Sequence, residues 1–274
     1  MRIDISNLKK SFGEKVAVDI DQYTVNDGDM IGLVGNNGAG KTTMFRLMLD
    51  LLKADDGCVE YHIDDHVINP AESEEWKQVT GAYIDEGFLI DFLTPEEYFL
   101  FVGKVSGLNR EEVEKRQAQY EQLMAGEILG QKKLIRDLSA GNKQKVGIIA
   151  ALMTLPSLVI LDEPFNFLDP SSQNVLKHVL REYNKVTGAT IIISSHNLAH
   201  TIDICPRITL LEQGHIVKDL KNVDHSAAAE LDAYFNQGIE DILTPEENPE
   251  PAPQEPEKET QEPEKEVQEP ATEE

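Results

Sequence analysis

The chain has 274 residues, 40% of them hydrophobic, and a formal net charge of −25 at pH 7. This charge argues against a duplex-DNA-binding surface, because contacts to phosphates need clustered lysine and arginine side chains, and we expect no nucleic-acid partner. No window reaches the ~18 consecutive apolar residues of a membrane-spanning helix, and the first residues lack the pattern of a secretion signal. We therefore expect a soluble protein that stays inside the cell, with Cys58 and Cys205 as reduced thiols.

The first part of the chain predicts two kinds of strand. Short alternating segments around turns favour a small antiparallel sheet beside the main core, and they lie at Ile3–Leu8, Val16–Val25 and Cys58–Ile63. Between them, the apolar run Met30–Val34 is typical of a strand buried in a parallel sheet.

A glycine-rich segment follows this buried strand and precedes a helical pattern. Its spacing, G-x-x-x-x-G-K-[ST], lets glycines turn successive backbone N–H groups toward one anion, and the next helix adds the partial positive charge of its N-terminus. We expect Lys41 to reach the outer phosphates of a nucleotide and Thr42 to bind Mg²⁺. The predicted phosphate-binding residues are Gly35, Asn36, Asn37, Gly38, Ala39, Gly40, Lys41, Thr42 and Thr43.

Residues 94–134 interrupt the alternation of strands and helices. They are typical of two helices, Pro95–Ser106 and Arg110–Met124, with no strand between them. We interpret this segment as a helical insertion.

Beyond the insertion, strand-like runs alternate with amphipathic stretches such as 171–186. The runs are Leu158–Leu161, Thr190–Ile193 and Arg207–Leu211. This alternation predicts an α/β fold with a mostly parallel sheet and helices on both of its faces.

Two carboxylates end the first of these later strands. Asp162 and Glu163 follow Leu158–Leu161 at the edge where an open α/β sheet presents its ligand site. Asp162 is placed to hold Mg²⁺, and Glu163 is placed to polarise an attacking water as a general base. An acidic pair at a strand end is also common as a solvated terminus, so the functional interpretation depends on its combination with the glycine-rich segment.

Residues 244–274 differ in composition from the rest of the chain. From Pro245 onward they hold 12 glutamates, seven prolines and two lysines, with three near-copies of a seven-residue unit that start at Gln254, Gln261 and Gln268. A coiled coil is excluded because each unit contains a proline and lacks apolar a and d positions. We expect a disordered acidic tail, either a solvating appendage or a segment that binds a partner.

Several motifs together resemble the nucleotide-binding subunit of an ATP-binding-cassette (ABC) transporter, in particular those of ABC-2-type and multidrug exporters. Leu138–Asn142 stands ahead of a helix in the place of the family signature, usually written LSGGQ. Phe12 matches the aromatic residue that stacks on adenine, Phe167–Pro170 matches the loop that joins the two sites of a dimer, and His196 matches the switch histidine. The resemblance covers roughly residues 1–220 in family order and spacing.

This resemblance implies a P-loop NTPase (RecA-like) core with a mostly parallel sheet, an N-terminal antiparallel β subdomain and a helical insertion. It divides the chain into an ABC-type ATPase domain at 1–222, whose helical subdomain covers about 86–138, a C-terminal helix or linker at 223–243, and the disordered acidic tail at 244–274. The helix itself is expected at about 224–236.

The resemblance also implies an enzyme that hydrolyses ATP with Mg²⁺, and it assigns roles to residues. The catalytic residues are Glu163, His196 and Lys41. Outside the glycine-rich segment, the nucleotide ligands are Phe12, Ser139 and Gly141. The last two open a helix, whose N-terminus would face the γ-phosphate from the opposing subunit. The metal ligands are Thr42, Asp85 and Asp162.

Two places depart from the family pattern. Asp85 stands where the family usually has a glutamine that senses Mg²⁺ and contacts the membrane subunit, and a carboxylate is a stronger Mg²⁺ ligand than an amide. Ala140 and Asn142 replace a glycine and a glutamine of the signature. We expect these changes to affect turnover and coupling more than nucleotide binding.

The predicted mechanism places two ATP sites between two chains, in a homodimer or heterodimer that closes on ATP and reopens after hydrolysis. Because ATP binds the closed pair better than the open one, it can move an attached partner. We expect that partner to be a separate integral membrane permease, which would make the chain cytoplasmic and peripheral to the inner face of the membrane. The permease is expected to dock beside Asp85 and the helical insertion, on apolar surface from Phe88, Phe92, Phe99 and Phe101.

Export is favoured over import, because only a short helix and the acidic tail follow residue 220. The alternative is an ABC-type ATPase with weak hydrolysis that acts as a cytosolic regulatory protein or as a machine outside transport. A P-loop kinase or GTPase is disfavoured, because such proteins lack a segment like Leu138–Asn142.

Overall fold

The structure is a computed structural model that describes residues 1–236. Met1–Tyr234 form one unit, and the predicted acidic tail at 244–274 lies outside the described residues. Within the described part of the chain, no helix is both long and apolar enough to cross a lipid bilayer.

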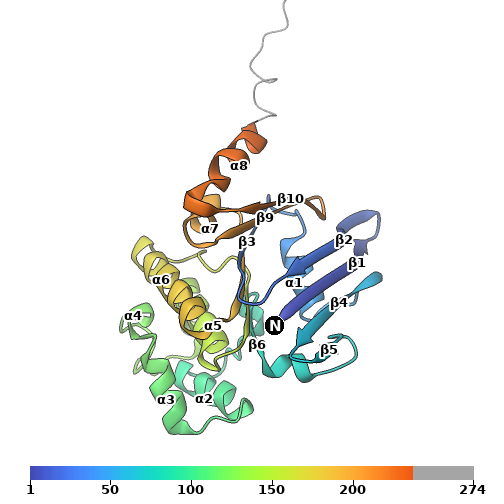
Figure 1. The fold of residues 1–274 in the computed structure, drawn as a ribbon. Coiled ribbons are helices and arrows are strands. Elements are labelled where there is room, and N and C mark those ends of the chain that lie inside the picture. Colours follow the sequence, from blue (N-terminus) through green and yellow to red (C-terminus); the bar gives the residue numbers. More distant parts are fainter. Residues whose placement is uncertain (237–274) are drawn as a thin grey trace, which may run out of the picture. The chain divides into compact units, whose positions relative to one another are not determined.

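The smaller of two sheets has four antiparallel strands in the order β2-β1-β4-β5 (Figure 1). Its strands are β1 (Arg2–Phe12), β2 (Lys15–Val25), β4 (Asp56–Ile63) and β5 (His66–Ile68). Alternate residues such as Ile3 and Ile5 are buried, as expected for strands with one face on a core. Three of the four strands were predicted from the alternating pattern, and β5 was not, because three residues are too few for a pattern to show.

The larger sheet has six strands in the order β10-β9-β3-β8-β7-β6. They are β3 (Met30–Val34), β6 (Thr80–Tyr83), β7 (Leu158–Leu161), β8 (Thr190–Ser195), β9 (Arg207–Glu212) and β10 (His215–Lys221). Five of them are parallel, and β10 pairs antiparallel with β9 at the edge. Every residue of β3, β7 and β8 is buried. The predicted α/β fold with a mostly parallel sheet is confirmed.

Helix α1 (Lys41–Met48) links the two sheets through one hydrophobic core. Phe45 and Met48 of this helix belong to the same buried cluster as Tyr61 of β4 and Ile31 of β3, and Figure 1 shows α1 between the two sheets. The Tyr61 hydroxyl donates a 2.7 Å hydrogen bond to the Met48 carbonyl, which fixes the C-terminal end of α1 against the smaller sheet. The start of α1 follows the loop at the carboxyl end of β3.

The helical insertion consists of α2 (Pro95–Val105), α3 (Arg110–Ala118) and the short α4 (Glu121–Met124). The first two helices begin with capping boxes, Thr94 with Glu97 and Asn109 with Glu112, which satisfy N–H groups that have no partner within the helix. The prediction of one helix from Arg110 to Met124 is wrong, because the helical hydrogen bonding stops at Ala118 and restarts after Tyr120.

Phe99 corrects a second prediction about this insertion. Its side chain is fully buried, so it belongs to the core and supplies no surface for a partner. Phe88, Phe92 and Phe101 are each about half exposed or more, so they contribute apolar surface.

The remaining helices are α5 (Ala140–Met153), α6 (Pro170–Thr187), α7 (Leu198–Ile204) and α8 (Ala227–Asn236). Helix α5 packs on β6 and β7, and α7 packs on β3 and β8. The helix predicted at about 224–236 begins at Ala227, because Asp224 and His225 have left-handed φ angles of 52° and 62° that no α-helix contains. Short 3₁₀ turns lie at Glu75–Gln78, Glu86–Phe88, Ile135–Asp137 and Val223–His225.

Candidate nucleotide site

The glycine-rich segment forms a loop between β3 and α1, and its backbone requires glycine at two positions. Gly40 caps α1 with φ 112°. A Cβ on it would lie 2.2 Å from the Ala17 carbonyl oxygen, and a Cβ on Gly35 would lie 2.2 Å from that of Leu211. Larger residues are therefore excluded, and the loop can approach a ligand with its backbone while the N-terminus of α1 favours an anion.

Lys41 lies across this loop. Its Nζ donates a 2.7 Å hydrogen bond to the Gly35 carbonyl and a longer one, 3.4 Å, to that of Asn36. The same nitrogen is 3.4 Å from Oε1 of Glu163, and the lysine side chain is only 7% exposed. The loop thus holds a nearly buried cation next to the end of β7. The tip of the loop, Asn36 to Gly38, is exposed, and Ala39 is buried beneath it.

Thr42 and Asp162 meet across 120 residues of sequence. The Thr42 hydroxyl donates a 2.5 Å hydrogen bond to Oδ2 of Asp162, and the Ser194 hydroxyl at the end of β8 donates to Oδ1. Burial raises the pKa of Asp162 above its usual range, although these two hydrogen bonds oppose the shift. The carboxylate is therefore a buried anion whose charged form a nearby cation would stabilise.

The oxygen atoms of Thr42 and Asp162 fit Mg²⁺. Mg²⁺ prefers hard oxygen ligands and is usually bound through one or two carboxylates together with substrate phosphates and water. Within residues 1–236 there is no cluster of three or more acidic, histidine or cysteine side chains that could hold a metal by itself. A hydroxyl and a carboxylate are fewer ligands than Mg²⁺ needs, so this pair suits a cation whose other ligands are phosphate oxygens and water.

Glu163 is held in an unusual conformation beside this pair. Its φ of 47° lies in the left-handed region, which costs free energy for a residue other than glycine, asparagine or aspartate. The backbone is fixed there by two side chains, since its N–H donates to the Ser194 hydroxyl and its carbonyl accepts from the Gln144 amide. The carboxylate Oε2 contacts the backbone N–H of His196 at 3.2 Å and the ring Nδ1 at 2.8 Å.

Phe12 lies at the mouth of the loop. The ring is 52% exposed at the end of β1, and it lines a cavity of about 200 Å³ together with Lys15, Ala17, Gly38, Gly40, Lys41, Thr42 and Thr43. An exposed aromatic face next to a phosphate-binding loop suits the stacking of a planar base.

Ser139 precedes α5 and Gly141 lies in its first turn, and neither lines that cavity. Ser139 caps the helix, and its hydroxyl accepts a hydrogen bond from the Asn142 N–H. Gly141 packs so closely on the loop after β7 that a Cβ on it would lie 2.6 Å from the Phe167 carbonyl oxygen. Ala140, between these two residues, lines a second cavity together with Asp162 and Glu163.

Asp85 is occupied by two partners that the sequence did not indicate. Its Oδ2 accepts a 3.1 Å hydrogen bond from Arg46 of α1, and its Oδ1 accepts from the Gly87 N–H. Asp85 also lines a cavity of about 240 Å³ with Asp162 and Glu163. It thus lies near the predicted metal ligands, while its carboxylate is bound by other groups.

Sequence reasoning missed Ser194, Gln144 and Arg46, which position Asp162, Glu163 and Asp85 respectively. Ser194 had the only usable signal, since it directly follows the apolar strand run in Thr190–Ser195. Gln144 and Arg46 lie within helices whose pattern says nothing about polar contacts with distant loops.

Comparison with known proteins agrees with this geometry. Residues 18–166 match the model of the family described as ABC transporter. The linearmycin resistance ATP-binding protein LnrL of Bacillus subtilis is 34% identical over 215 residues, which are 78% of this chain and 68% of that protein. The bacitracin transport ATP-binding protein BcrA of Enterococcus faecalis is 34% identical over 223 residues, 80% of this chain and 68% of that protein.

Relatives also include an uptake protein. The tungstate uptake system ATP-binding protein TupC of Peptoclostridium acidaminophilum is 30% identical over 216 residues, 79% of this chain and 97% of that protein. Among solved structures, an ATP-binding subunit of an ABC transporter superimposes with a TM-score of 0.73 at 25% identity, over 86% of this chain and 98% of that one. A dimeric ATP-binding cassette in a post-hydrolysis state with ADP and Pi shares the fold, with a TM-score of 0.70 at 22% identity over 81% of this chain and 99% of that one.

The chain therefore belongs to the ABC transporter family, as an ATP-binding ATPase domain. The predicted family and the P-loop fold are both confirmed.

Proposed function

We propose that this chain is the ATP-hydrolysing subunit of an exporter, which drives transport through a separate membrane permease by closing and reopening a dimer. The observation that carries the proposal is the convergence of Lys41, Thr42, Asp162, Glu163 and His196 at the carboxyl ends of three neighbouring strands. Their chemistry covers the needs of phosphoryl transfer to water: a cation, a metal-binding pair of oxygens, a base and a hydrogen-bond donor.

Each residue has a role that its contacts support. Lys41 binds the β- and γ-phosphates, exchanging its hydrogen bonds to the loop carbonyls for charge-assisted ones to phosphate. Thr42 and Asp162 would hold Mg²⁺, which would neutralise charge on the phosphates. Glu163 accepts a proton from the attacking water. Its backbone N–H is held by the Ser194 hydroxyl, and the contact with the His196 ring orients its carboxylate for this task.

His196 hydrogen-bonds with Glu163 and would contact the γ-phosphate with its other ring nitrogen. In the structure Nδ1 faces Oε2 of Glu163 at 2.8 Å, so Nε2 is the atom left to meet a phosphate oxygen. This arrangement makes the base and the histidine a coupled pair, and cleavage of the phosphate changes the surroundings of both.

The second half of each site comes from a second chain. Ser139 and Gly141 lie at the N-terminus of a long helix, where an anion is stabilised by unpaired N–H groups. Neither residue lines the cavity beside the glycine-rich loop of its own chain, so we assign them to the γ-phosphate held by a partner. The dimer known for a cassette of the same fold supports this arrangement.

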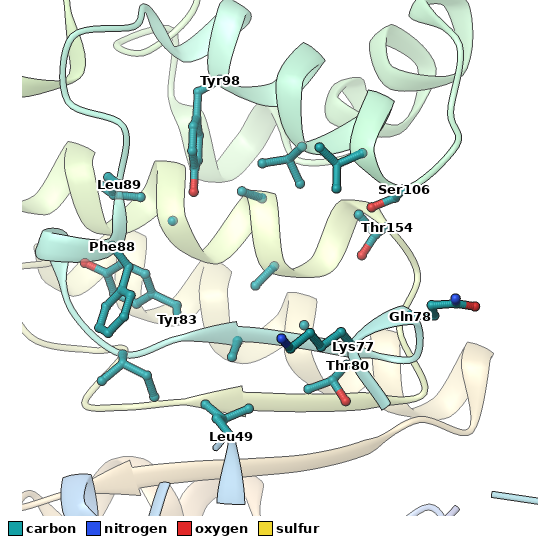
Figure 2. Close-up of a pocket in the computed structure, with 18 of the residues that line it drawn as sticks. Leu49, Lys77, Gln78, Thr80, Tyr83, Phe88, Leu89, Tyr98, Ser106 and Thr154 are labelled. Carbon is teal, nitrogen blue, oxygen red and sulfur yellow. The ribbon is translucent and has the colours of Figure 1, made fainter. Parts of the chain in front are cut away.

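The permease is proposed to dock in a groove between the helical insertion and the edge strand β6. The groove encloses about 740 Å³, and Figure 2 shows Tyr98 of α2 directed into it above Tyr83 and Phe88. Its rim carries Phe88 and Val105, which are 51% and 74% exposed. This apolar surface lies next to Asp85, which lines a cavity together with Asp162 and Glu163. A membrane subunit bound there would contact the turn beside the catalytic carboxylates.

Export is supported by two relatives named for bacitracin transport and linearmycin resistance. A position at the inner face of the membrane follows from the proposed docking on a permease. The tungstate uptake relative shows that importers share the same cassette. Two experiments test the proposal together. Phosphate release by the purified chain must depend on Mg²⁺ and ATP and disappear in Lys41→Ala, and an affinity-tagged chain must recover an integral membrane protein from native membranes. Failure of either overturns the corresponding part.

A further inference from the structure

We propose that Lys15 is a second cationic ligand for the phosphates of the bound nucleotide, acting beside Lys41. This inference rests on the proposed ATP site and adds to it a residue that lies outside the glycine-rich segment. Lys15 is the first residue of β2, and it pairs with Phe12 across the hairpin that joins β1 and β2.

The position of Lys15 brings its ammonium group over the loop. It lines the same cavity of about 200 Å³ as Phe12, Lys41 and Thr43. A Cβ on Gly38, at the exposed tip of the loop, would lie 3.7 Å from the Lys15 Nζ, and apart from Gly38 and its two chain neighbours no other atom would lie within 4 Å of it. A ligand that lies on Phe12 and reaches Lys41 therefore passes within reach of this nitrogen.

Charge distinguishes Lys15 from the other lysines of the hairpin. Lys9 Nζ is 3.3 Å from a carboxylate oxygen of Asp19, and Lys10 Nζ is 2.7 Å from one of Asp55. Among the residues that the structure describes, no carboxylate lies within the 4.0 Å of an ion pair from Lys15 Nζ. The two neighbouring lysines are neutralised by acidic partners, whereas Lys15 keeps its charge for a ligand.

An unpaired cation at this point has a specific use. The chain carries a net charge of −25, so its overall field repels an anionic nucleotide. A lysine at the mouth of the loop offsets this repulsion locally and donates charge-assisted hydrogen bonds to phosphate oxygens. The long stem of lysine lets it follow the phosphates as a point charge.

The test compares Lys15→Gln with Lys9→Gln in the full chain, by titrating ATP and ADP in the presence of Mg²⁺ with isothermal calorimetry. Lys9 is the matched control, because it is an exposed lysine on the same hairpin that does not line the cavity. We expect Lys15→Gln to weaken both nucleotides by about three- to tenfold, as for a partly screened charge contact, and Lys9→Gln to stay within about twofold. Lys15→Arg keeps the charge and is expected to retain most of the affinity.

Ionic strength provides a second readout. The difference between wild type and Lys15→Gln should shrink as salt rises from about 0.05 to 0.5 M, because screening removes a charge contact and leaves the rest of the site intact. Equal affinity of wild type and Lys15→Gln at low salt would overturn the inference, and so would an equal loss in Lys9→Gln. Lys41→Ala separates the two proposals: if it abolishes binding while Lys15→Gln does not weaken it, only the role of Lys15 fails.

Discussion

Replacing Glu163 with glutamine should stop hydrolysis while leaving ATP bound. The carboxylate is 2.8 Å from the His196 ring and 3.4 Å from the Lys41 ammonium. Glutamine has the same shape and still offers one oxygen to either neighbour, but it cannot take a proton from water. Loss of a positioned general base costs about 10²- to 10⁴-fold in rate, which is about 3–5 kcal/mol of activation free energy.

The variant should fold and bind nucleotide. Its main structural loss is the charge of the ion pair with Lys41, and that lysine keeps its hydrogen bonds to the loop carbonyls of Gly35 and Asn36. The strained φ of 47° and the hydrogen bonds of its backbone with Ser194 and Gln144 are unchanged by the substitution. ATP affinity is therefore expected to stay near that of wild type or to rise.

The assay is steady-state phosphate release with saturating Mg·ATP, combined with a nucleotide-binding titration of the same preparation. Glu114→Gln is the matched control, because Glu114 is an exposed glutamate in α3, with only Arg110 as its ion-pair partner within the described residues. We expect the control to hydrolyse like wild type and Glu163→Gln to lose at least about 100-fold. Turnover in Glu163→Gln close to that of the control would refute the assignment of the base.

Three other substitutions probe the rest of the site. Burial raises the pKa of Asp162, so its carboxyl group binds a proton more tightly in the folded chain than in the unfolded chain. Keeping this group charged at neutral pH therefore lowers the free energy of unfolding, and the loss is recovered as pH falls through the folded pKa. Asp162→Asn should therefore raise the calorimetric unfolding temperature at pH 7, with an advantage that shrinks toward acid pH. Gly40→Ala places a Cβ 2.2 Å from the Ala17 carbonyl oxygen at φ 112° and should cost about 2–4 kcal/mol in urea unfolding, with loss of ATP binding. Asp85→Asn should change stability by less than about 1 kcal/mol, because its pair with Arg46 is half exposed, and should raise the Mg²⁺ concentration for half-maximal hydrolysis; an unchanged Mg²⁺ requirement would contradict Asp85 as a metal ligand.

The phosphate loop could be predicted because its information is local. The motif lies within seven consecutive residues, from Gly35 to Lys41, between a strand and a helix that each have a clear apolar pattern. The meeting of Thr42 with Asp162 depends on strand order, since β8 lies between β3 and β7. The sequence predicts that parallel strands end at one edge, but not which strands are neighbours.

Contacts between side chains of different elements could not be predicted. The pairing of Arg46 with Asp85 joins a helix face to a turn, and no periodicity indicates it. Phe99 was assigned to a surface because an amphipathic helix with several phenylalanines does not show which of them faces the core, and packing of α2 against α3 and α5 buries this one. Strand β10 was missed because its residues are only half buried or exposed at a sheet edge.

In the proposed dimer, two chains enclose ATP between the glycine-rich loop of one and the helix that follows Ser139 of the other. The most direct measurement is sedimentation velocity of the Glu163→Gln chain with Mg·ATP, with ADP, and with ATP after the further substitution Ser139→Arg. We predict that the Glu163→Gln chain is dimeric with Mg·ATP. It should be monomeric with ADP, and monomeric with ATP once Ser139→Arg is added. If the Glu163→Gln chain stays monomeric at every ATP concentration, while calorimetry shows the nucleotide bound, the proposed ATP-dependent dimer is wrong.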